Sequence, residues 1–168
     1  GVPSMQSFEE DAASRCPWDM ILFDNKLYLG GGDYNDNSGP VDIWAYDLTN
    51  ECWENTGSVP DEEVDRFTVI DGQLIAPGID PKDDWSLGNY YKMTANGWET
   101  VRTIPKGIHI FDMVVYDGKL FAGIGTESGS YPVVCSEDNG QTFYQIPFER
   151  NGVEVDTIIG DAAYSGKE

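Results

Sequence analysis

VVYDGKLFAGIG, at residues 114–125, consists of an apolar run, an Asp-Gly pair and a second apolar run that ends in glycines. The Asp117-Gly118 pair between two such runs predicts a tight β-hairpin, because glycine accepts the positive φ that the turn needs. The sequence therefore predicts two antiparallel strands joined at this pair.

The same pattern occurs twice upstream. Residues 21–32 read ILFDNKLYLGGG, and residues 69–78 read VIDGQLIAPG. The aspartates at the three turns, Asp24, Asp71 and Asp117, are separated by 47 and 46 residues. A repeat of this length indicates one structural unit used several times.

Each hairpin is followed by two further strand-like segments and a proline. The segments rich in β-branched and aromatic residues predict strands at 18–23, 27–30, 42–48 and 52–59 in the first unit, 66–70, 74–76, 89–93 and 98–104 in the second, 111–116, 119–123, 132–136 and 142–146 in the third, and 154–159 and 162–164 in a fourth. Pro60, Pro105 and Pro147 end the three complete units. Four short strands in a unit of about 42 to 47 residues are typical of a propeller blade.

The predicted fold is all-β: a β-propeller of four-stranded antiparallel blades, about three and a half of them in this chain. We divide the chain into an N-terminal strand or extension at 1–14, blades at 15–60, 61–105 and 106–147, and the start of a fourth blade at 148–168. A β-sandwich does not explain three units with the same internal order. Because a ring usually needs at least four blades, we expect either a segment of a larger propeller or edges that pair with other chains.

The composition is strongly acidic. The 168 residues include 30 acidic and 10 basic ones, for a net charge of −20, which argues against nucleic acid or an anionic membrane as a partner. No apolar window is long enough to predict a membrane span. The charge suits an extracellular or cell-surface protein, a Ca²⁺ binder or a protein with cationic partners, and solubility alone also explains it. Cys16, Cys52 and Cys135 leave open one disulfide with a free thiol or three thiols.

In a propeller, one face would carry the loops at 31–41, 60–65, 78–88, 105–110, 125–131 and 148–153, and these loops are rich in acidic residues. Asp33, Asn35 and Asn37 present alternating oxygen side chains, which makes them a candidate Ca²⁺ site. The alternative is a solvated turn, because Ser38 stands where an EF-hand loop has glycine.

Polar residues recur five positions before each turn aspartate, on strands that are otherwise apolar. They are Asp19, Arg66, Asp112 and, in the fourth unit, Asp156. We expect them to line the central channel, either as an ion-paired tunnel or as a pocket for a hydroxylated ligand such as a glycan. Candidate partners at the rim are Trp18, Trp85 and Tyr34 for stacking and His109 as a polar or basic group.

Two stretches resemble known blade families. Residues 136–143, SEDNGQTF, match the Asp-box S-x-D-x-G-x-T-[WF] at Ser136, Asp138, Gly140, Thr142 and Phe143, and are similar to the repeats of sialidase-like (BNR-repeat) propellers. The first unit resembles a kelch motif, with the Gly30-Gly31 doublet and then Tyr46 and Trp53. The box implies a structural role in which Ser and Asp bond turn amides, Gly adopts the special backbone angle and the aromatic ring packs between sheets.

The sialidase resemblance implies an arginine triad, a Tyr–Glu nucleophile pair and an Arg-Ile-Pro motif. The chain has four arginines, of which Arg66 alone falls at a channel position, so we carry over no catalytic residue. We expect a non-catalytic propeller segment of a secreted or cell-surface protein that binds a glycan or protein partner through its acidic loop face. The alternatives are a fragment of a sialidase-like glycoside hydrolase and a structural subunit that assembles through blade edges.

Overall fold

The computed structural model describes residues 16–32, 39–82, 84–125, 132–147, 149–150 and 153–154. Among these residues the protein is all-β. The strands are β1 (Cys16–Phe23), β2 (Lys26–Gly32), β3 (Val41–Asp47), β4 (Cys52–Val59), β5 (Thr68–Ile70), β6 (Gln73–Pro77), β7 (Leu87–Thr94), β8 (Gly97–Pro105), β9 (His109–Tyr116), β10 (Lys119–Gly125), β11 (Val133–Ser136), β12 (Tyr144–Gln145), β13 (Glu149–Arg150) and β14 (Val153–Glu154).

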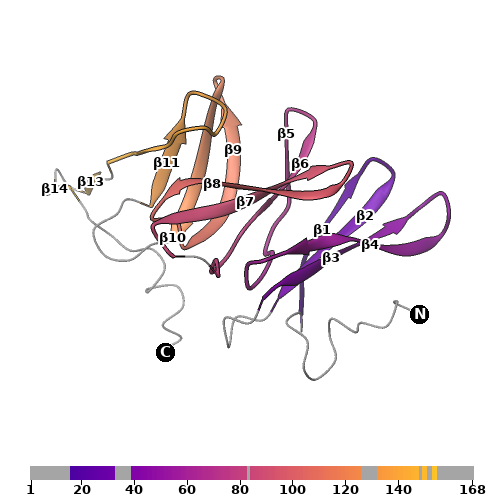
Figure 1. The fold of residues 1–168 in the computed structure, drawn as a ribbon. Helices are drawn as coiled ribbons and strands as arrows, with labels where there is room; N and C mark the ends of the chain where they lie inside the picture. The colour runs from indigo at the N-terminus through magenta and orange to yellow at the C-terminus, as the bar shows by residue number, and fades with distance from the viewer. Residues whose placement is uncertain are drawn as a thin grey trace.

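The first twelve strands form three antiparallel sheets with the same order. Strands β1 to β4, β5 to β8 and β9 to β12 each follow one another as neighbours in their own sheet, and we call these the first, second and third sheets. Figure 1 shows the second sheet lying between the other two. Within the described residues, no helix offers a long apolar segment of the kind that crosses a membrane.

The three hairpin turns have the backbone that their sequences predict. Asp117 and Gly118 have φ of +49° and +72°, and the pairs Asp24-Asn25 and Asp71-Gly72 also have positive φ at both residues. Positive φ at both central positions is the geometry of a type I′ turn, whose twist matches that of the flanking strands. Local backbone preference therefore explains why each unit opens with a hairpin.

Two apolar cores hold the sheets together. Between the first and second sheets, the fully buried Tyr28 packs edge-on against Phe67 and Trp98, with ring centroids 6.4 Å apart in both pairs. Between the second and third sheets, Tyr90 and Met113 belong to the other buried cluster. Burying one such side chain stabilises the fold by about 1.5–3 kcal/mol, so the two cores are the main attraction between the sheets.

A row of backbone bridges also joins the sheets at one end. Gly32 pairs with Glu63, Glu63 with Ile79, and Ile79 with His109, all antiparallel. The backbone amide of Val64 donates to the Gly31 carbonyl at 2.9 Å, so residues 61–65 run between the ends of β2 and β6. This segment is where the acidic residues of the second unit are placed.

The structure differs from the sequence-based expectations in several places. Strand β5 begins at Thr68 rather than at residue 66, and β12 has only two residues. Within the region expected to be a loop at 148–153, β13 pairs with β14, whose second residue, Glu154, lies just beyond it. The expected strand in 1–14 and most of the expected fourth unit lie outside the described residues. Cys52 and Cys135 are free thiols.

Candidate functional site

The acidic loop expected to face solvent between β4 and β5 is instead buried. Asp61, Glu62 and Glu63 are 0%, 1% and 2% exposed. The Glu62 amide donates to the Ile79 carbonyl at 3.0 Å, which draws the segment in between neighbouring sheets. This corrects the expectation that the acidic side chains at 60–65 lie on an open ligand face, because inter-sheet backbone pairing outweighs the preference of these side chains for water.

Asp61 is held by residues from the second sheet. The Asn89 amide donates to Asp61 Oδ1 at 2.9 Å, and the Tyr91 hydroxyl donates to the same oxygen. Arg102 then donates to Asn89 Oδ1 at 3.3 Å and to the Leu87 carbonyl at 2.8 Å. These bonds satisfy Asp61 Oδ1, one of the two oxygens of a buried carboxyl group that is costly to remove from water.

Glu63 and Asp65 are neighbouring carboxyl groups whose pKa values are both raised. Burial, followed by the negative charges of Asp65 and Glu62, raises the pKa of Glu63 to about 8. Burial also raises the pKa of Asp65. No hydrogen-bond donor among the described residues reaches Glu63 Oε2 or Asp65 Oδ1, so ionising these buried carboxyl groups is costly.

His109 lies beside this cluster and contacts a third carboxylate. Its Nε2 is 2.8 Å from Asp80 Oδ1, and both side chains are partly buried. Burial alone would raise the pKa of Asp80, but the hydrogen bond and charge of His109 outweigh burial and lower it. His109 therefore has a structural partner that ties β9 to the end of β6.

The residues expected at the channel position are brought into contact across neighbouring sheets. Asp19 Oδ2 accepts a hydrogen bond from the Phe67 amide at 2.6 Å. Arg66 Nη1 lies 3.3 Å from Asp112 Oδ2, and these two side chains are 56% and 53% exposed. The three residues thus form a polar row that runs from the first sheet to the third and is open to solvent at Arg66 and Asp112.

The aromatic candidates have different positions. Trp18 on β1 and Trp85 in the loop before β7 are 45% and 44% exposed. Trp85 follows Asp84, which pairs with Arg102 at 3.2 Å. Both rings can therefore stack on a ligand from solvent. Tyr34 and Asp156, as well as the Ca²⁺ candidates Asp33, Asn35 and Asn37, lie outside the described residues.

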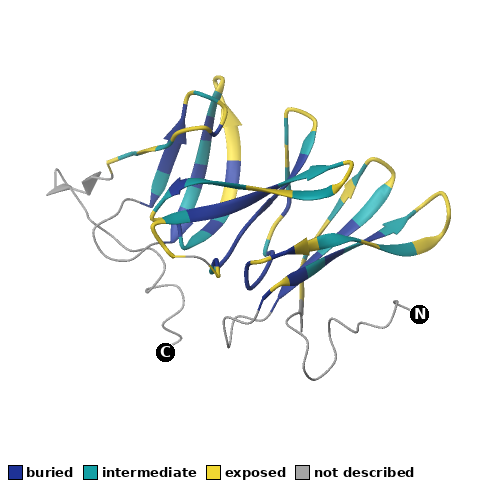
Figure 2. Cartoon of the chain, viewed as in Figure 1, coloured by how far each residue is buried: buried dark blue, intermediate teal, exposed yellow. Residues whose placement is uncertain are grey.

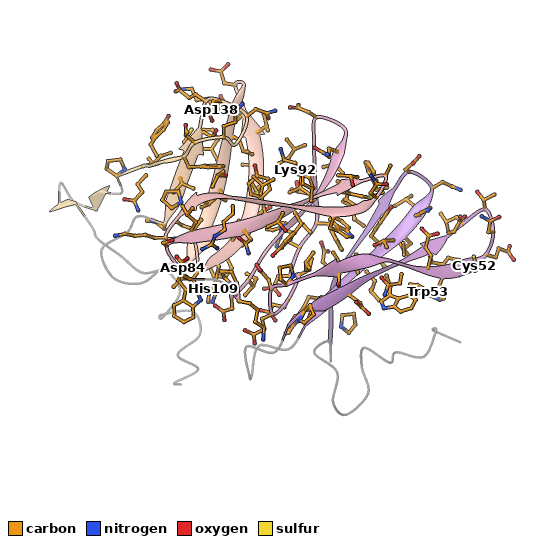
Figure 3. All side chains as sticks on the ribbon, viewed as in Figure 1. Cys52, Trp53, Asp84, Lys92, His109 and Asp138 are labelled. Carbon is orange, nitrogen blue, oxygen red and sulfur yellow. The ribbon has the colours of Figure 1, made fainter. Side chains whose placement is uncertain are left out.

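The Asp-box turn lies at the opposite end of the sheets, as the positions of Asp138 and His109 in Figure 3 show. Ser136 Oγ accepts from the Gly140 amide at 2.8 Å, and Asp138 Oδ1 accepts from the Thr142 amide at 2.8 Å. Hydrogen bonds from Thr142, above all from its side chain, lower the pKa of Asp138 to about 2. Gly140 has φ of +83°, and Phe143 packs against the second core.

Metal binding has no support in the described part of the chain, where no group of three His, Cys, Asp or Glu side chains is arranged to hold an ion. Sequence reasoning did not identify the network of Asp61, Asn89, Tyr91 and Arg102. Its members come from a loop and from strands β7 and β8, and no local motif marks them.

The arrangement offers two chemical environments. The carboxyl groups of Asp61, Glu62 and Glu63 are buried in a segment that links the sheets. The polar row and the exposed Trp18 and Trp85, in contrast, are accessible to a ligand. No protein-family model matches this chain, and a comparison with curated proteins found no similar protein.

Proposed function

We propose that the chain is a segment of a β-propeller and that its three four-stranded sheets are successive blades. The proposal is supported by the identical strand order of the three sheets and by the spacing of their turns. The Asp-box turn and its hydrogen bonds support a kinship with sialidase-like propellers, and the kelch-like features of the first unit support the same architecture.

We further propose that this segment is non-catalytic and binds a glycan or protein partner, outside the cell or at its surface, through the polar row of Asp19, Arg66 and Asp112. The observation that carries this proposal is the solvent-exposed ion pair between Arg66 and Asp112. A half-exposed arginine can keep its carboxylate partner and still donate to a ligand hydroxyl or carboxylate, since guanidinium has five N–H donors.

The buried carboxyls support binding rather than hydrolysis. A glycosidase needs an acid and a second carboxylate on opposite sides of an accessible glycosidic bond. Glu63 has the raised pKa of an acid, but it is 2% exposed and its neighbour is a carboxyl of the same closed cluster. His109 is likewise engaged by Asp80.

The test is calorimetric titration of the protein with a panel of neutral and sialylated oligosaccharides, before and after Arg66→Ala. We expect the variant to bind at least about tenfold more weakly, which corresponds to about 1.4 kcal/mol. Lys119→Ala is the matched control, because Lys119 forms an exposed ion pair with Glu137 at the Asp-box end. Equal binding by Arg66→Ala would contradict the assigned site, and turnover of an aryl glycoside would favour the hydrolase alternative.

A second candidate function, a structural subunit, is favoured by one observation. Met20 on β1 is 59% exposed, although its counterparts in the other two sheets, Phe67 and Met113, are buried in the cores. Mass measurement in solution, with and without Ca²⁺, separates an assembling subunit from a monomeric binding module.

A further inference from the structure

The three sheets pack on one another through equivalent positions. We call one side of each sheet its leading face. It contains the residues that lie four positions before, three positions after and five positions after the turn aspartate. It also contains the residue on the third strand that pairs with the residue five positions after the turn aspartate. The members are Met20, Leu27, Leu29 and Trp44 in the first sheet, Phe67, Leu74, Ala76 and Tyr91 in the second, and Met113, Leu120, Ala122 and Val134 in the third.

The opposite side of each sheet is its trailing face. It is defined by the residues three before, one before and four after the turn aspartate. The members are Ile21, Phe23 and Tyr28 in the first sheet, Thr68, Ile70 and Ile75 in the second, and Val114, Tyr116 and Phe121 in the third. Each core of the protein joins the trailing face of one sheet to the leading face of the next.

The leading face is buried wherever another sheet precedes it. In the second and third sheets all of its members are at most 5% exposed. In the first sheet Met20 is 59% exposed, and Leu27, Leu29 and Trp44 are only partly buried. The same apolar surface is therefore present in the first sheet, where none of the described sheets covers it.

The trailing face shows the converse at the other end of the stack. Val114 and Tyr116 on β9 are 58% and 75% exposed, whereas their counterparts in the first two sheets are partly buried. Phe121 is also less buried than its counterparts Tyr28 and Ile75. Figure 2 shows the exposed half of β9. A methyl group on Gly30 would meet Val64 O at 2.7 Å, whereas one on the equivalent Gly123 would meet no atom within 4 Å.

We propose that the leading face of the first sheet binds the trailing face of the third sheet in a second copy of this chain, so that copies add head to tail. No described residue covers these two faces. They are the same pair of surfaces that make both cores inside the chain, and the positions that pack in the cores are apolar in each of them. The association goes through sheet faces rather than through strand edges. Because the two faces differ, the contact is heterologous, and it leads to a closed ring or to a growing filament.

The net charge of −20 opposes the approach of two copies, so salt should strengthen the association by screening repulsion between them. The decisive measurement is mass by light scattering or sedimentation from about 5 to 200 μM in 0.15 and 0.5 M NaCl. We expect species at multiples of 18.6 kDa that increase with concentration and with salt.

Two variants make the test specific. Met20→Glu damages the leading face and Tyr116→Glu the trailing face, and both sites are exposed enough for the fold to tolerate a charge. Each variant alone should be monomeric, with association at least about tenfold weaker. An equimolar mixture should form a 1:1 dimer that grows no further, because one intact leading face meets one intact trailing face.

Trp85→Glu is the matched control, since Trp85 is equally an exposed aromatic but lies on neither face. It should leave association unchanged. A wild-type protein that is monomeric across this range overturns the proposal. Association that survives both face variants, or a mixture that remains monomeric, also overturns it and points to strand edges or to another partner.

Discussion

Gly32 and Glu63 approach so closely that a methyl group on Gly32 would lie 2.0 Å from Glu63 Cβ. The two residues form an isolated antiparallel bridge between the end of β2 and the segment that precedes β5. Only a residue without a side chain fits there, so the glycine run that closes β2 is what admits the acidic segment between the sheets.

Gly32→Ala should therefore destabilise the protein by about 2–3 kcal/mol, because the methyl group pushes Glu63 and the chain around it out of place. Urea unfolding monitored by tryptophan fluorescence measures the change. Gly123→Ala is the control, since a methyl group there meets no neighbour within 4 Å, and its stability should be unchanged or slightly higher. Equal effects of the two substitutions would contradict the close approach.

Glu63 makes the stability of the protein fall as pH rises. Its carboxyl keeps a proton up to about pH 8 in the folded state, but loses it from an ordinary pKa of 4.5 in the unfolded state. The unfolded state is therefore favoured increasingly from about pH 4.5 to pH 8, by up to about 1.4 kcal/mol per pH unit.

Glu63→Gln should remove most of this slope and stabilise the protein by about 2–4 kcal/mol at pH 8, with little change at pH 4.5. The measurement is the free energy of unfolding at several pH values between 4.5 and 8.5. Glu99→Gln, at an exposed position on β8, should leave the slope as in the wild type. A wild-type slope in Glu63→Gln would show that this carboxyl is ionised in the fold.

Tyr91 and Tyr28 are both fully buried but differ in their hydroxyl contacts. Tyr91 donates to Asp61, whereas no described residue bonds the Tyr28 hydroxyl. Tyr91→Phe should cost about 1–3 kcal/mol because it weakens the support of a buried carboxylate, and Tyr28→Phe should be neutral or stabilising. Thermal unfolding of the two variants gives the comparison, and a larger loss in Tyr28→Phe would contradict the assigned contacts.

Asp138 should stabilise the Asp-box turn in a pH-dependent way. Its pKa is lowered to about 2 by Thr142 and Ser136, so its contribution is complete above the ordinary value of 3.8 and is lost as pH falls toward 2. Asp138→Asn should lower the Tm near pH 6, and the difference from the wild type should vanish near pH 2. A constant difference across this range would mean that the charge plays no part.

Much of the fold could be predicted because it rests on local interactions. The turn at Asp117-Gly118 follows from backbone preference, and the short apolar runs in β1, β9 and β10, bounded by turn residues, predict strands. The hydrogen bonds of Ser136 and Asp138 lie within eight residues, so the motif contains all the groups that make them.

The candidate site was predicted only in part. The common spacing of Asp19, Arg66 and Asp112 predicted that they lie at equivalent places, but their partners depend on how the sheets stack. The sequence also predicted that the acidic side chains at 60–65 lie on an open ligand face, whereas Asp61 and Glu63 are buried. Burial of a charged group depends on the donors that other strands supply, and sequence spacing contains no information about them.

The sequence by itself determined the strands, the hairpins and the four-stranded meander of each unit, because turn geometry and the two-residue period of a strand act between near neighbours. Tertiary structure alone decided that Arg66 pairs with Asp112, that Asp80 holds His109, and that Glu63 keeps its proton. The two ion pairs join residues 46 and 29 positions apart, and the proton on Glu63 is kept because the segment around it is buried. Both effects exist only after sheet faces have packed and excluded water.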